Sequence, residues 1–262
     1  MQAKPTKLKP TTTMNNNHSQ IQTYCKDLKL SWILENYGAL HEQALKKKTG
    51  SLEYLRELLR GEAQRRHERA IERRIKAARF PVLKTLESFN WQWPEQIDRP
   101  QLEHLASLRF VENKHNAVLL GPVGVGKTHL ATAIALKACQ KGHKVLYINA
   151  IEAINDLITA KKQGQLKQSL RKYTNVELLV LDEIGYLPID KSGADLLFQI
   201  ISARYERGSL MLTTNKAFKD WPTIFNNDST LTSAVLDRLL HHCETVVIQA
   251  SSYRMRKTKT KD

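Results

Sequence analysis

Between residues 21 and 82, apolar side chains recur at the spacing of helical turns. The first series comprises Leu28, Leu30, Ile33, Leu34 and Tyr37, and the second comprises Leu52, Leu55, Leu58 and Leu59. Such spacing places the apolar residues on one face of a helix. Gly50 and Ser51 separate the two series and mark a plausible helix start. The pattern predicts a small, all-helical N-terminal domain over residues 21–88.

The last predicted helix, roughly residues 51–79, carries two stripes. The apolar stripe comprises Ile71, Ile75, Ala78 and Val82, and the basic stripe comprises Arg65, Arg69, Arg73 and Lys76. The two stripes lie about 200° apart around the helix, so one face is expected to pack and the other is cationic. The basic stripe fits either a solvated face balanced by local acids or a contact with nucleic acid. Eight basic and two acidic residues between Arg65 and Lys84 keep DNA binding open.

From residue 116 onward, short apolar runs alternate with helical segments. Five runs are candidate strands, at residues 117–120, 145–149, 176–182, 210–214 and 244–248. Runs that are nearly continuous in Val, Leu and Ile are typical of strands buried on both faces of a parallel sheet. The pattern predicts an α/β domain over residues 89–250, with helices on both sides of a five-stranded sheet. Residues 89–100 contain two prolines and indicate a linker, in which Trp91 and Trp93 are expected to pack against a neighbouring domain.

Both ends of the chain are basic and poor in apolar residues. We expect residues 1–20 to form a flexible leader and residues 251–262 to form a tail. No run approaches the roughly 18 apolar residues of a membrane span, and the N-terminus lacks the apolar stretch of a secretory signal. These features favour a cytoplasmic protein without a membrane partner.

Composition narrows the function classes further. With 41% apolar and 26% charged residues, the chain is neither wholly disordered nor fibrous. Its three cysteines, Cys25, Cys139 and Cys243, are far apart and form no CxxC pair, which argues against a disulfide framework or a zinc site. A net charge of +15 predicts a polyanionic partner, with nucleic acid as the first candidate.

A phosphate-binding motif follows the first predicted strand. Residues 121–128 spell GPVGVGKT, which matches G-x4-GK[ST] and precedes a helical run. Glycines let successive backbone N–H groups face phosphate oxygens, and the helix N-terminus adds partial positive charge. Lys127 would reach the β and γ phosphates, and the Thr128 hydroxyl would bind Mg²⁺. The predicted nucleotide contacts are Gly121, Pro122, Val123, Gly124, Val125, Gly126, Lys127, Thr128 and His129.

Three later positions complete the expected site. Asp182 ends a buried strand, where its carboxylate would bind Mg²⁺, and the adjacent Glu183 would polarise water for attack on the γ-phosphate. Asn215 follows the fourth predicted strand and would orient that water. The sequence after Asn215 lacks the Asp of a guanine-reading NKxD motif, which favours ATP.

Arg238 lies in LDRLLHH, just before the last predicted strand. If ATP lies between subunits, its guanidinium could reach the γ-phosphate of a neighbouring protomer. Without that context, Asp237 and Arg238 are an ordinary pair on a helix surface.

Together these segments resemble the AAA+ ATPases of the initiator clade, which contains DnaA, the DnaC-type helicase loaders and the IstB-type helper ATPases of insertion-sequence transposition. The similarity is greatest to the IstB group and runs from about Leu28 through GPVGVGKTHLA, LLVLDEIGYLP, LLFQIISARYERG, LTTNKAF and LDRLLHHC. The resemblance implies that Lys127 and Thr128 belong to Walker A and that Asp182 and Glu183 belong to Walker B. It further implies that Asn215 is sensor 1 and that Arg238 is the arginine finger.

The chain departs from most AAA+ proteins after the core. Only 14 residues follow Ile248, too few for a C-terminal helical lid, so no lid is expected. Arg254 in SSYR is a candidate to perform part of the function of such a lid. Arg204 in SARYERG is a further candidate for the interface between subunits.

The resemblance implies an ATPase that oligomerises on double-stranded DNA and activates and targets a partner transposase of the IstA type. A DnaC-type helicase loader is the nearest alternative, although residues 65–79 contain no aromatic platform for single-stranded DNA. A DNA-coating architectural protein without useful ATP turnover is a second alternative. A small-molecule kinase is disfavoured by Glu183 and by the missing lid.

Overall fold

The computed structural model describes residues 12–93, 96–250 and 253. The chain divides into two compact units, Met1–Ala70 and Ile71–Asp262. This division lies earlier than the expected boundary between residues 88 and 89. The reason is packing, because Ile75, Ala78, Phe80 and Leu86 all contact the core of the second unit.

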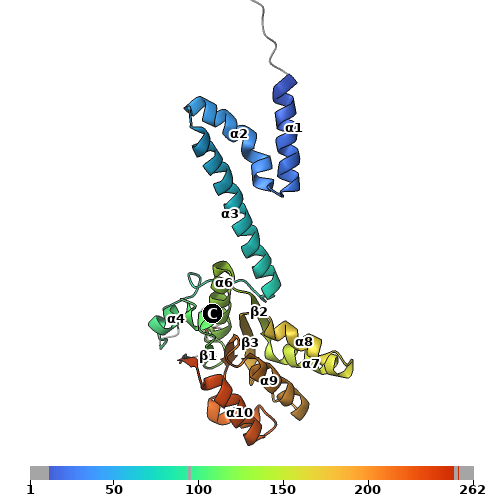
Figure 1. Ribbon diagram of the computed structural model, residues 1–262. Coiled ribbons are helices and arrows are strands. Elements are labelled where there is room, and N and C mark those ends of the chain that lie inside the picture. The colour runs from blue at the N-terminus through green and yellow to red at the C-terminus, as the bar shows by residue number, and fades with distance from the viewer. Residues whose placement is uncertain (1–11, 94–95, 251–252, 254–262) are drawn as a thin grey trace, which may run out of the picture. The chain divides into compact units, whose positions relative to one another are not determined.

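The first unit consists of α1 (Thr12–Asp27), α2 (Ser31–Lys47) and the first part of α3 (Ser51–Ala78) (Figure 1). Its small core comprises Cys25, Ile33, Tyr37 and Leu58. Residues 12–20, which fall within the expected leader, belong to α1. Residues 1–11 lie outside the described residues.

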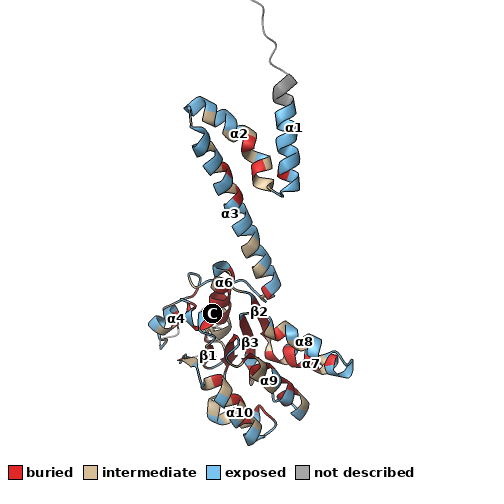
Figure 2. Ribbon diagram, viewed as in Figure 1, coloured by how far each residue is buried: buried red, intermediate tan, exposed pale blue. Residues whose placement is uncertain are grey.

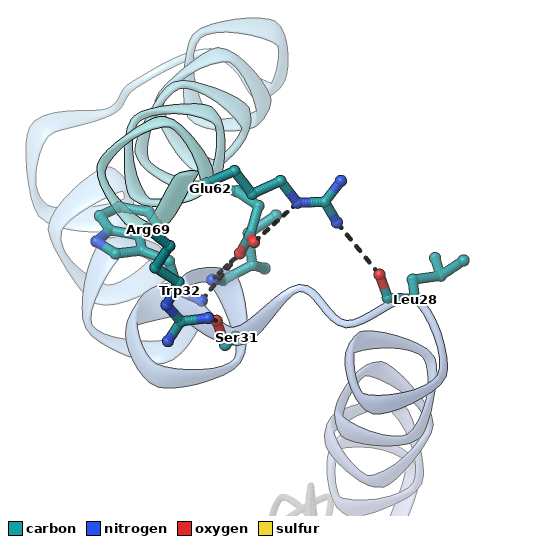
Figure 3. A network of polar contacts seen from close by, with 7 residues as sticks. Leu28, Ser31, Trp32, Glu62 and Arg69 are labelled. Carbon is teal, nitrogen blue, oxygen red and sulfur yellow. Dashed lines mark hydrogen bonds and ion pairs between the residues drawn. The ribbon is translucent and has the colours of Figure 1, made fainter. Parts of the chain in front are cut away.

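A buried carboxylate joins α2 to α3 in this unit (Figure 3). Glu62 is 4% exposed and accepts the backbone N–H groups of Trp32, at 2.9 Å, and Ile33, at 3.2 Å. These donors lie in the first turn of α2, whose N–H groups have no partner within the helix. Arg66 contacts the same carboxylate at 3.3 Å and donates to the Leu28 carbonyl at 3.2 Å. Glu62 therefore acts as a helix cap supplied from α3.

The second unit is built on a five-stranded parallel sheet in the order β2-β3-β4-β1-β5. The strands are β1 (Asn116–Leu120), β2 (Val145–Asn149), β3 (Leu178–Ile184), β4 (Ser209–Thr214) and β5 (Cys243–Val247). The helices are α4 (Arg99–Leu105), α5 (Arg109–Glu112), α6 (Lys127–Lys141), α7 (Ala150–Lys162), α8 (Leu166–Thr174), α9 (Lys191–Arg204), the 3-10 helix η1 (Phe218–Thr223) and α10 (Ser229–Leu240). The predicted five-stranded sheet is confirmed.

Alternate residues of each inner strand enter two separate cores. On β3, Leu178 and Val180 pack with α4, α5 and α6, whereas Leu179 and Leu181 pack with α7, α9 and α10. Successive side chains of a strand point to opposite faces, so the two cores cover the two faces of the sheet. Figure 2 shows β1, β2 and β3 mostly in the buried class, whereas the edge strand β5 is mostly of intermediate exposure. This double burial explains why the strands appear in the sequence as continuous apolar runs.

The segment after α3 packs more closely than a linker would. Phe89 is buried in the first core, and the partly buried Trp91 packs against the same core. The Trp91 ring also lies 5.0 Å from that of Phe89. The expected packing position of Val82 is wrong, because α3 ends at Ala78 and Val82 is 57% exposed. Residues 251, 252 and 254–262 lie outside the described residues.

Two further expectations concern the cysteines and the membrane. All three cysteines are free, and Cys25 and Cys139 are buried. Burial raises the pKa of the Cys139 thiol to about 11, so this side chain behaves as a small apolar group. Across the described residues, none of the helices is both long and apolar enough to cross a membrane.

Gly61 tests the packing of the first unit. A Cβ at this position of α3 would overlap the Trp32 ring, whereas a Cβ at Gly38 of α2 would meet nothing within 4 Å. Replacing glycine with alanine inside a helix normally stabilises it by about 1 kcal/mol. We expect Gly38→Ala to follow this rule, and Gly61→Ala to lower the free energy of unfolding by about 1–2 kcal/mol because of overpacking.

Urea denaturation of the full chain, followed by far-UV circular dichroism, measures both variants. Shifts of the two midpoints in the same direction would contradict the packing of Trp32 against α3.

Candidate nucleotide-binding site

A cavity of about 480 Å³ opens at the carboxyl edge of the sheet. Its lining comes from the phosphate loop, from the ends of β3 and β4 and from the segment after α3. The predicted residues that line it are Val123, Gly124, Gly126, Lys127, Thr128, His129, Glu183 and Asn215. Carboxyl ends of parallel strands are the usual place for ligands in such sheets.

The phosphate loop takes the backbone shape that its glycines permit. Gly124 and Gly126 have positive φ angles of 81° and 99°. A Cβ at Gly126 would lie only 2.7 Å from the Phe89 ring, so the glycine also allows a close aromatic contact. The Lys127 ammonium donates to the carbonyls of Gly121, at 2.7 Å, and Pro122, at 2.6 Å. These bonds hold its positive charge at the loop.

Not every residue of the motif faces the cavity. Gly121 and Val125 are buried, and Val125 packs in the core beneath the loop. Pro122 is exposed and is absent from the cavity lining. His129 lines the cavity, and its ring contacts the Thr85 carbonyl at 2.9 Å and the Phe89 ring at 5.1 Å. Gly121 and Val125 thus shape the loop from within.

Asp182 is the buried acid of the site. It is 6% exposed, and its carboxylate accepts from Thr128 at 3.3 Å, from Tyr147 at 2.8 Å and from Thr213. Burial, and then the charge of Asp182, raise the pKa of the Tyr147 hydroxyl, which therefore remains a hydrogen-bond donor. Sequence reasoning missed Tyr147 and Thr213, although both lie on predicted strands beside Asp182.

The pair of Thr128 and Asp182 fits a magnesium ion. Their oxygens lie 3.3 Å apart. Neighbouring ligands of an octahedral Mg²⁺ at about 2.1 Å are separated by about 3 Å. A hydroxyl and a carboxylate are also the oxygen ligands that this ion prefers.

An irregularity in β3 sets the orientation of the Glu183 side chain. The pairing of β3 with β4 shifts register between Leu181 and Ile184, and Glu183 has a positive φ of 63°. Such a backbone costs a non-glycine residue of order 1 kcal/mol. Thr213 compensates by accepting the Glu183 N–H at 2.9 Å, and the Asn149 amide donates to the carboxylate at 2.8 Å. The carboxylate is thereby held at the exposed side of the cavity, beside the end of β2.

Asn215 and Arg238 have different positions. Asn215 follows β4 and lines the cavity, close in the chain to Thr213 and Thr214. Arg238 is absent from the lining of this cavity in its own chain. Its guanidinium donates to the Ala234 carbonyl at 2.9 Å and lies 5.1 Å from the centre of the Phe198 ring. The fold thus brings Asn215, but not Arg238, to the site.

The expected interface role of Arg204 is wrong. This arginine is 1% exposed and donates to four backbone carbonyls, those of Tyr173, Val176, Glu177 and Ser209. Burial lowers the pKa of its guanidinium to about 10. The side chain joins the ends of α8 and α9 to the starts of β3 and β4. Arg254, the other candidate, lies outside the described residues.

The family described as IstB-like ATP binding protein matches residues 23–261. The chain belongs to this family. It is 42% identical over 240 residues to an insertion sequence IS21 putative ATP-binding protein of Pseudomonas aeruginosa, covering 92% of this chain and 90% of that protein. It is also 38% identical over 243 residues to the corresponding IS232 protein of Bacillus thuringiensis, covering 93% and 97%.

Two solved structures are similar to this chain in fold. A structure of DnaI gives a TM-score of 0.55 at 19% identity and covers 66% of this chain and 93% of that chain. AMPPCP-bound DnaA from Aquifex aeolicus gives 0.54 at 23% identity and covers 70% and 56%. The AAA+ P-loop fold and the assignment to an IstB-like ATP-binding protein are confirmed.

Replacing Lys127 tests whether this cavity binds ATP. We expect Lys127→Ala to weaken ATP binding about 30-fold or more, because a lost charge-assisted contact of about 2 kcal/mol corresponds to that factor. Titration with a fluorescent ATP analogue measures the affinity. Lys141→Ala, at the other end of α6, removes the same charge and should bind as the wild type does. Equal affinities in the two variants would contradict a phosphate contact for Lys127.

Replacing Arg204 tests whether its hydrogen bonds to backbone carbonyls stabilise the fold. Arg204→Met keeps a long side chain but leaves four carbonyls without their donor. We expect the free energy of unfolding to fall by about 3 kcal/mol or more. The exposed neighbour Arg207 provides the control, and Arg207→Met should change the urea midpoint little. A stable Arg204→Met protein would show that these carbonyls do not need the guanidinium.

Proposed function

We propose that the chain is the ATP-dependent regulatory subunit of an insertion-sequence transposition system. In this proposal it hydrolyses ATP, oligomerises on duplex DNA, and activates and targets a transposase of the IstA type. The placement of Glu183 carries the proposal, since its carboxylate is fixed by Asn149 at the cavity that the phosphate loop lines. The family and its insertion-sequence relatives support the role in transposition.

Hydrolysis would use the residues at the carboxyl edge of the sheet. Glu183 would accept a proton from water as the water oxygen bonds to the γ-phosphorus, while the bond from that phosphorus to the leaving ADP oxygen breaks. Asn215 would orient the water. Lys127 would neutralise charge on the phosphates, and Thr128 and Asp182 would hold Mg²⁺. The positions of Glu183, Asn215, Lys127 and Thr128 along the cavity support such a reaction.

DNA binding rests on charge and exposure. The chain carries a net charge of +15, and Arg65, Arg69, Arg73 and Lys76 are all exposed on α3. Arg69 also donates to the Ser31 hydroxyl at 2.7 Å, so part of its hydrogen-bonding capacity is used within the first unit (Figure 3). Contacts of this kind reach DNA phosphates and give salt-dependent binding with weak sequence preference.

Self-association explains the place of Arg238. Because it does not line the cavity of its own chain, we propose that it completes the site of a neighbouring protomer. ATP would then act as a clamp that favours assembly, and hydrolysis would release it. The partly exposed guanidinium over Phe198 is positioned at the surface by α9 and α10.

Steady-state ATP hydrolysis, with duplex or single-stranded DNA at fixed salt, tests the proposal. We expect stimulation chiefly by duplex. Arg238→Ala should lower kcat roughly 1,000-fold, as an arginine finger does, and Glu183→Gln should lower it at least about 100-fold. Arg109→Ala removes an exposed arginine elsewhere on the same unit and serves as the control.

Sedimentation of the same proteins with duplex measures assembly. Glu183→Gln should remain assembled, and Lys127→Ala should not assemble with nucleotide. A preference for single strands would favour a helicase loader. Normal assembly without turnover would favour an architectural protein.

A further inference from the structure

A second, strongly basic pocket lies at the opposite edge of the sheet from the nucleotide cavity. Its volume is about 250 Å³, and Val145, the first residue of β2, and Val176, just before β3, form part of its wall. Four cationic side chains also line it: Arg74, Arg79, Lys144 and Lys172. All of these residues belong to the unit Ile71–Asp262. Parallel strands start at the edge opposite their carboxyl ends, so the pocket is separate from the ATP site.

Nearby acids neutralise only part of this charge. Lys172 pairs with Asp156 at 2.7 Å. The Glu177 carboxylate is used by the backbone N–H of Lys144, at 2.9 Å, and by the His143 ring, at 3.1 Å. Within 4 Å, Arg74, Arg79 and the Lys144 ammonium form no ion pair with any described residue. At longer range, Arg79 lowers the pKa of Asp156 and Lys144 lowers that of Glu177, so two acids are shared among four cations. The pocket therefore retains excess positive charge.

Arg74 lines the pocket and keeps hydrogen-bonding capacity that the chain does not use. Its Nη1 atom is buried and has no hydrogen-bond partner among the described residues. A buried N–H group without an acceptor is unfavourable and is rare in folded proteins.

Capping of α6 is the simplest alternative role for Arg74. Its Nη2 atom lies 4.0 Å from where a Cβ on Gly142 would be, beside the end of that helix. However, the carbonyls of Ala138 and Cys139 already accept the N–H groups of His143, at 3.0 Å, and Gly142, at 3.2 Å. These two carbonyls are therefore satisfied without Arg74, whose charge can still interact favourably with the end of the helix.

We propose that this pocket binds a backbone phosphate of nucleic acid. A guanidinium and an ammonium converging from separate elements match the several acceptor oxygens of a phosphate. The exposed Arg73 and Lys76 belong to the same stretch of α3 as Arg74, which favours a polyanion with regularly repeated charges over an isolated anion. The inference rests on the proposed function, and it names a contact outside the basic stripe predicted from the sequence.

The salt dependence of duplex binding tests this contact. Fluorescence anisotropy with a labelled 30-base-pair duplex of mixed sequence would compare the full chain with Arg79→Gln/Lys144→Gln, two exposed positions whose replacement should leave the fold intact. Lys161→Gln/Lys162→Gln removes the same charge from exposed positions of α7 and is the matched control. Arg74→Gln is a second pocket variant, and melting curves followed by circular dichroism check folding.

Each phosphate contact contributes about 0.9 to the slope of log K against log salt. We expect the Arg79/Lys144 variant to lower the slope by roughly 1–2 and the affinity by about 10-fold at 0.1 M salt, with a smaller loss for Arg74→Gln. The control should retain the wild-type slope. Binding of a fluorescent ATP analogue should be equal in all of these proteins.

The outcomes separate the two proposals. If the wild type binds duplex and the pocket variants keep the slope of the control, the phosphate contact is refuted and DNA binding stands. If the wild type does not bind duplex, the proposed function fails, and the nucleic-acid occupant fails with it. Poly-glutamate that binds the wild type and displaces duplex, but does not bind the pocket variants, would identify an acidic protein segment as the occupant and overturn the inference.

Discussion

A carboxylate nearly excluded from water must be hydrogen-bonded, and the nucleotide site is organised around one, that of Asp182. Its donors come from three directions: Thr128 at the start of α6, Tyr147 on β2 and Thr213 on β4. The parallel register brings these elements to one edge, and the buried charge then fixes their mutual positions. Thr213 also accepts the backbone N–H of Glu183, so the same group of side chains helps to orient Glu183.

Most of the second unit could be predicted from the sequence, because its local patterns and its tertiary packing agree. Strands β1 to β4 are buried on both faces and therefore appear as apolar runs, and the phosphate loop has a fixed spacing. The partners of Asp182 could not be predicted, because Tyr147 and Thr213 meet it only through strand pairing. A tyrosine or threonine within a strand carries no local signal of such a contact.

The errors share a physical cause, which is that burial of a side chain is a tertiary property. Arg204 resembles a surface arginine in sequence, yet carbonyls separated by more than 30 residues along the chain surround it. Val82 continued a helical spacing after the helix had ended at Ala78.

The contact between Phe89 and Gly126 connects the segment that follows α3 with the phosphate loop. The ring lies against the loop where a Cβ would clash, and it also meets His129. A ligand that rigidifies the loop thus also restricts the segment that carries Phe89, and ordering that segment favours the ligand by the same free energy. The conformation of the segment around residue 89 is therefore expected to affect nucleotide affinity, although this segment contains no nucleotide-binding motif.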